Sequence, residues 1–120
     1  MLANGAVEKG IEHLRLGIRL SPLDERAAFW GTLLARALFR TGDTEEAVIE
    51  AKRACQNSEN VAAARIILAV IELVRGNNES AKYAFDEAKR IDPSVAERTI
   101  KPLVGQRGIQ TLRQAGFLTG

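Results

Sequence analysis

The amino-acid sequence predicts an all-α fold built from antiparallel helix pairs, and three observations lead to this prediction. The chain repeats itself with a spacing of 34 residues. Glycine, proline and small polar residues divide it into segments of helical length. No segment alternates apolar and polar residues with the period of two that is typical of a half-buried strand. With 120 residues, of which 46% are hydrophobic, the chain has room for one domain.

The internal repeat is the strongest of these signals. The recurring alanines fall where two helices must approach closely, and the recurring glycines fall where the chain must turn between them. We therefore expect two helices in each repeated unit. Between residues 26–59 and 60–93, seven positions are identical after a shift of 34 residues: Ala28 and Ala62, Leu34 and Leu68, Ala35 and Ala69, Gly42 and Gly76, Glu45 and Glu79, Ala47 and Ala81, and Ala54 and Ala88.

The first full unit covers residues 23–59. Its first helix is expected to begin after Ser21-Pro22, because proline is tolerated in the opening turn of a helix, and to run to about Thr41. Gly42 ends that helix. A second helix then runs to about Gln56.

The second full unit covers residues 60–93. Asn60 is expected to cap a helix from Val61 to Arg75, which ends at the repeated glycine. A fourth helix runs from about Glu79 to Ile91, where the proline at position 93 stops it.

Two shorter pieces flank these units. Before them, residues 6–20 are expected to form a single helix. After them, the period is lost in a tail of residues 94–120. The tail is expected to hold a short helix that ends near Ile100, before Pro102, and an amphipathic stretch over about residues 103–115.

The pattern of Leu-small pairs, turn glycines, alanines and a closing proline resembles the tetratricopeptide repeat. This resemblance covers about residues 1–93 and implies a right-handed superhelical stack, with residues 94–120 as a C-terminal capping segment. Leu38 and Glu72 depart from it, because the family usually has an aromatic residue there. The positions that carry the resemblance are Leu34, Ala35, Gly42, Ala47 and Ala54, then Leu68, Ala69, Gly76, Ala81, Phe85, Ala88 and Pro93.

On the same frame, residues 1–22 resemble the second half of a repeat whose first helix is missing. An unpaired helix leaves its apolar stripe, here Ile11, Leu14 and Ile18, in contact with water. We therefore expect the chain to be the C-terminal fragment of a longer protein.

In tetratricopeptide domains the first helix of each pair lines a concave groove, so the resemblance also implies a binding surface for a protein or peptide. Thr32, Ile66 and Val70 do not match the Asn and Lys residues with which some members grip chaperone tails, and we do not expect that ligand. The groove positions are Phe29, Thr32, Arg36, Phe39 and Arg40, then Ala63, Ile66, Val70, Leu73 and Val74.

The helix over residues 61–75 needs cover, because twelve of its fifteen residues are apolar and surround its axis. Ile66, Val70 and Leu73 are the side chains that neighbouring repeat helices would leave exposed. Three alternatives for what covers these side chains stay open: the tail stretch over residues 103–117, a second copy of the chain, or an external peptide.

A narrower resemblance concerns the parent protein. The segments Ile11–Asp24 and Leu112–Phe117 are similar to the C-terminal repeat regions of bacterial class III adenylate/guanylate cyclases. This similarity implies a regulatory or assembly module and places no catalytic residue in the chain. Two alternatives are the repeat region of a winged-helix transcription regulator and a purely structural dimerisation spacer.

Composition excludes most other functions. The chain has one histidine, His13, and one cysteine, Cys55, so we expect no catalytic residue, metal site or cofactor. A net charge of +2 makes nucleic acid an improbable partner. The longest apolar run has six residues, Ile66–Ile71, so we expect no membrane span. The lone cysteine and the lack of a signal sequence favour the cytoplasm.

Overall fold

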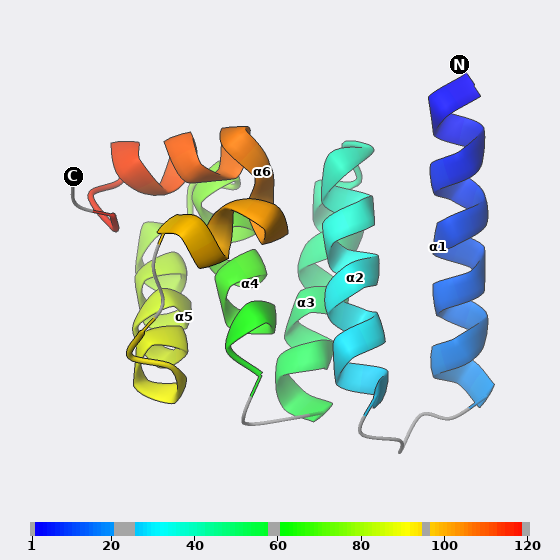
Figure 1. Cartoon of the computed structure of the whole chain (residues 1–120), viewed down its shortest axis with the longest axis horizontal. Coiled ribbons are helices and arrows are strands. Elements are labelled where there is room, and N and C mark those ends of the chain that lie inside the picture. The colour runs from blue at the N-terminus through cyan, green and yellow to red at the C-terminus, as the bar shows by residue number, and fades with distance from the viewer. Residues whose placement is uncertain (1, 21–25, 58–60, 95–96, 119–120) are drawn as a thin grey trace.

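The computed structural model describes residues 2–20, 26–57, 61–94 and 97–118 (Figure 1). These residues form helices and turns, with no strand among them, so the all-α prediction is confirmed. The helices are α1 (Leu2–Leu20), α2 (Arg26–Arg40), α3 (Thr44–Asn57), α4 (Ala62–Val74), α5 (Asn78–Ile91) and α6 (Glu97–Gln114).

The first five helices stand side by side, and α6 lies across α4 toward the end of the row that is opposite α1 (Figure 1). Helix α2 packs mainly against α3, and α4 packs mainly against α5. Helix α1 lies against α2 at one end of the row, whereas α4 packs against α2, α3, α5 and α6. Helix α4 is therefore the centre of the molecule.

The two helices of each pair, α2–α3 and α4–α5, are joined by the same type of turn. Gly42 and Gly76 adopt φ angles of +91° and +86°, which a residue with a side chain rarely adopts. Each glycine sits just past a helix end and completes the hydrogen-bond pattern of a Schellman motif. The bonds are Gly42 N–H to the Phe39 carbonyl (3.2 Å), Asp43 N–H to the Leu38 carbonyl (2.9 Å), Gly76 N–H to the Leu73 carbonyl (3.1 Å) and Asn77 N–H to the Glu72 carbonyl (2.8 Å).

The core consists of two apolar clusters that share α4. Six repeated alanines are fully buried, which allows the helices to approach closely: Ala35, Ala47, Ala54, Ala69, Ala81 and Ala88. The first cluster joins α2, α3 and α4 and includes Leu34, Leu38, Val48, Ile67 and Ile71. The second cluster joins α4, α5 and α6 and includes Ile66, Val70, Phe85, Ile100, Ile109 and Leu112.

The tail differs from the prediction. Pro102 lies inside α6, and the break falls instead at Gly105, whose backbone has φ +76° and ψ 176°. The chain bends there because a glycine tolerates this conformation while other residues do not. Leu103 and Val104, just before the bend, pack against both core clusters. The bend thus lets α6 follow the surface of the helices beneath it.

The start of α4 also differs from the expected one. Val61 occupies the N-cap position, without a side-chain capping bond, and the helix begins at Ala62. The predicted cap, Asn60, lies outside the described residues, as do Ser21 and Pro22 before α2.

Candidate functional site

The centre of the α4 half of the expected groove is covered, whereas Val74 at its end is 43% exposed. Ile66 and Val70 are buried, and Leu73 packs against the same cluster. Helix α6 supplies the cover through Ile100, Ile109 and Leu112, which are themselves buried. Of the three possible occupants, the structure therefore has the tail over this face.

Two residues of the α2 half also differ from the expectation. Thr32 is only 2% exposed, so it faces the interior and not a groove. Phe39 is partly buried and packs against both core clusters, which makes it a contact between the repeated units. The resemblance to the tetratricopeptide repeat assigned these positions to the groove from their register alone. The packing of α2 against its neighbours decides which of them are exposed.

The remaining α2 residues form an open surface. Phe29 is 57% exposed, Arg40 is exposed and Arg36 is half-buried. Together with Leu33 they follow the spacing of three and four residues that places side chains on one face of a helix. This face borders a cavity of about 220 Å³ between α1 and α2, which we call the Arg36–Arg40 cavity. Its lining residues are Gly10, Leu14, Leu33, Arg36, Ala37 and Arg40.

The glycines of α1 are the only hint in the sequence that α1 borders this cavity. Helix α1 approaches α2 closely at Gly17, where an added Cβ would lie 3.3 Å from the Trp30 ring. Two turns earlier, at Gly10, an added Cβ would meet nothing within 4 Å. Gly10 therefore leaves open space beside the two arginines. Its spacing of seven residues from Gly17, which packs on Trp30, is the sequence feature that points to this space.

The electrostatics of the cavity favour an anion. Burial lowers the pKa of Arg36 from its ordinary value, and the charge of Arg40 lowers it further. Within the described part of the chain, neither arginine has a hydrogen bond or ion pair to a carboxylate. The other lining residues are apolar or glycine. Two like charges beside a partly dehydrated surface are stabilised by a negative group placed between them.

A second cavity, of about 450 Å³, lies among α3, α4 and α5 and includes Cys55 and Tyr83. Burial raises the pKa of the Cys55 thiol, and the nearby Arg65 offsets this only in part. The thiol is therefore protonated at neutral pH and is a poor nucleophile.

Among residues 2–20, 26–57, 61–94 and 97–118, no group of three or more His, Cys, Asp or Glu side chains could hold a metal ion. No helix in these ranges combines the length and apolarity needed to cross a bilayer.

Comparison of the chain with protein-family models, with curated proteins and with solved structures gave no match.

Proposed function

We propose that this chain is a protein–protein interaction or assembly module made of tetratricopeptide-like repeats. The proposed architecture is a half repeat (1–22) and two full repeats (23–59 and 60–93) in a right-handed superhelical stack, with residues 94–120 as a cap. Three findings support it: the 34-residue period, the matching turns at Gly42 and Gly76, and the burial of the repeated alanines.

The proposed contact surface is the face of α2 that borders the Arg36–Arg40 cavity. A single observation carries this assignment: Arg36 and Arg40 lie side by side on an accessible, otherwise apolar surface, without a carboxylate partner among the described residues. A partner segment that presents an Asp or Glu beside an apolar side chain would complement both features. Phe29 extends the apolar part of this surface.

The parent protein is proposed to be an adenylate or guanylate cyclase, with this module at its C-terminal end. The similarity of residues 11–24 and 112–117 to the repeat regions of such enzymes supports this assignment. In that setting the module would act in regulation or assembly, and the chemistry would belong to another domain.

A structural dimerisation spacer is the second candidate, and one observation favours it. Leu16 and Leu20, one turn apart on α1, are 47% and 72% exposed. Two exposed leucines on a helix at the end of the row could pair with a second copy of the chain.

Selection of peptides from a random displayed library tests the first proposal. We expect the selected peptides to carry an acidic residue next to an apolar one. Their affinity, measured by fluorescence anisotropy, should fall at least about tenfold with R36E/R40E, because two attractive charges become repulsive. The matched control is Arg107→Glu, since Arg107 is exposed on α6. Equal affinities for R36E/R40E and R107E would refute the assigned surface.

Sedimentation distinguishes the spacer. If the chain is a dimer through α1, the double variant L16E/L20E becomes a monomer while R36E/R40E stays dimeric. A wild-type protein that sediments as a monomer at all accessible concentrations removes the spacer from consideration.

A further inference from the structure

A third cavity, of about 490 Å³, lies on the other side of the α1–α2 contact, where α3 packs. It takes residues from three helices and is separate from the Arg36–Arg40 cavity, with which it shares no lining residue. Its lining residues are Arg15, Ile18 and Arg19 of α1, Leu34 of α2, and Glu50 and Arg53 of α3. We call it the Arg19 cavity.

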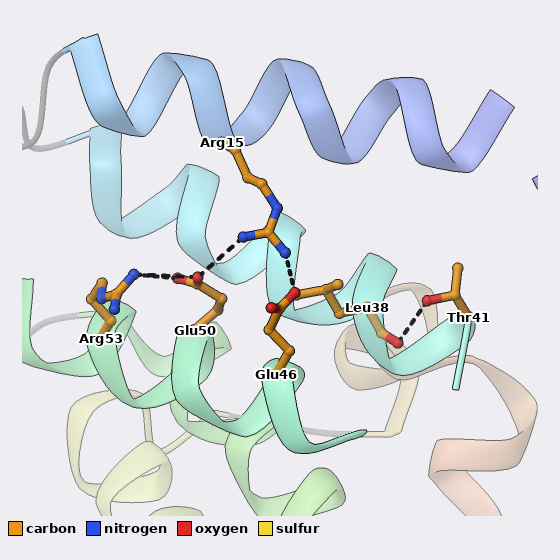
Figure 2. A network of polar contacts seen from close by, with 6 residues as sticks. All are labelled: Arg15, Leu38, Thr41, Glu46, Glu50 and Arg53. Carbon is orange, nitrogen blue, oxygen red and sulfur yellow. Dashed lines mark hydrogen bonds and ion pairs between the residues drawn. The ribbon is translucent and has the colours of Figure 1, made fainter. Parts of the chain in front are cut away.

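A buried carboxylate organises two of the three arginines (Figure 2). The Glu50 side chain is 7% exposed and accepts hydrogen bonds from Arg53 Nη1 at 3.1 and 3.2 Å. Arg15 Nη1 lies 3.8 Å from the same carboxylate, while Arg15 Nη2 contacts Glu46. Arg15 and Arg53 are thus held in place by two glutamates, and their positions do not depend on a ligand.

Arg19 gives the cavity an excess of positive charge. It has no carboxylate partner among the described residues, although it lies one turn after Arg15 and lines the same cavity. Three guanidinium groups face two carboxylates, so the site carries one uncompensated positive charge. One negative charge on a ligand would balance it.

The walls of the cavity determine the chemical character of the uncharged part of the ligand. Ile18 presents apolar surface between the charged residues of α1 and α3, and Leu34, which is 1% exposed, closes the inner wall of the cavity. A fully hydrated ion such as chloride gains nothing from these walls. An anion with an apolar body can bury that body against them while its charge stays near the arginines.

We propose that the Arg19 cavity is a binding site for a small organic monocarboxylate with a short apolar chain. The carboxylate binds Arg19, with Arg15 and Arg53 adding to the positive field, and the chain lies along Ile18 and Leu34. This proposal is independent of the protein-interaction surface, because the two cavities share no lining residue.

Titration of the full chain with hexanoate, followed by the amide shifts of α1, α2 and α3 in NMR spectra, tests the site. We expect saturable binding that weakens at least about fivefold in R19Q, since a charge-assisted hydrogen bond is lost. R107Q removes an exposed arginine of α6 and should bind like the wild type. R36Q/R40Q should also bind like the wild type, which separates this site from the other cavity.

Two ligand controls require no variant. Acetate, which lacks most of the apolar chain, should bind about tenfold more weakly than hexanoate if the chain is buried. Hexylamine, with the opposite charge, should give no saturable shift at these helices. The proposal is overturned if hexylamine binds as well as hexanoate, if R19Q matches R107Q, or if hexanoate binding is lost in R36Q/R40Q instead.

Discussion

Arg75, the residue that follows the last turn of α4, joins Glu72 of its own helix to Glu45 of α3. Its Nη1 donates to Glu72 Oε1 at 2.7 Å, while its Nε and Nη2 donate to the two Glu45 oxygens at 3.1 Å. Glu72 is 2% exposed and also accepts a hydrogen bond from Asn77 Nδ2 at 3.3 Å. Arg75 therefore neutralises a carboxylate that is almost completely withdrawn from water.

Removing Arg75 should destabilise the fold more when residue 72 is a charged glutamate than when it is a neutral glutamine. We expect R75A to lower the free energy of unfolding about twice as much in the wild type as in the E72Q background, because a buried charge without its partner is destabilising. Urea denaturation of the four proteins in this cycle measures the difference. Equal losses in the two backgrounds would show that Glu72 does not depend on Arg75.

The cover that α6 provides predicts unequal effects for two leucines. Leu112 is buried in the cluster with Ile66 and Val70, whereas Leu20 on α1 is largely exposed. We expect L112A to lower the free energy of unfolding by about 3 kcal/mol, since it leaves a cavity, and L20A to change it by less than about 0.5 kcal/mol. Urea denaturation measures both. Similar small effects would mean that α6 does not form part of the core.

Two helical glycines should respond to alanine in opposite directions. At Gly108 an added Cβ would lie 2.5 Å from the Val104 Cβ, across the bend at Gly105. We expect G108A to destabilise the protein by about 1–3 kcal/mol through overpacking. G10A, where an added Cβ meets nothing within 4 Å, should stabilise it by about 0.5–1 kcal/mol through higher helix propensity. Thermal denaturation compares the two, and a stabilising G108A would contradict the close contact.

Cys55 should make the free energy of unfolding fall as the pH becomes alkaline. Burial raises the pKa of its thiol above the ordinary value of 9.0, so the folded chain holds this proton more tightly than the unfolded chain. The resulting stabilisation is complete below the unfolded pKa and is lost as the pH rises through the folded pKa. We expect C55A to remove this alkaline loss, as measured by urea denaturation between about pH 8 and 10.

The reactivity of the same thiol gives a second readout. At pH 8 a thiol-specific disulfide reagent should label Cys55 more slowly in the folded than in the urea-unfolded chain. Equal labelling rates would contradict the raised pKa.

Local signals predicted the helix pairs well because the turns are decided locally. Gly42 and Gly76 adopt conformations that glycine alone favours, so their positions in the sequence determine where helices end. The tail was predicted less well. Pro102 is an ordinary helix stop, yet the bend falls at Gly105, where Leu103 and Val104 contact both clusters. Packing against distant helices, which has no local signal, decides that position.

The candidate sites divide in the same way. The family resemblance assigned Phe29, Thr32, Arg36, Phe39 and Arg40 to a groove by their register alone. In the structure Phe29 and Arg40 are exposed and Arg36 is half-buried, whereas Thr32 is buried, and the register holds no signal for that difference. The Arg19 cavity had no signal in the sequence. Arg15 and its partner Glu46 are 31 residues apart, and the pair forms only because α1 lies close enough to α3. Contacts of this kind depend on how the helices are arranged.

The unequal packing of the helices gives the molecule a gradient of local stability along its row. Opening α4 would break both core clusters, so its amide protons should exchange with solvent only when the whole chain unfolds. Helix α1 packs against α2, reaches α3 through Arg15 and adds only partly buried side chains (Ile11, Leu14 and Ile18) to one cluster, so we expect it to detach while the rest stays folded. Both cavities that α1 lines disappear when it detaches. A ligand in either one therefore acts as a clamp that slows hydrogen exchange in α1 without altering the slowest amides of α4.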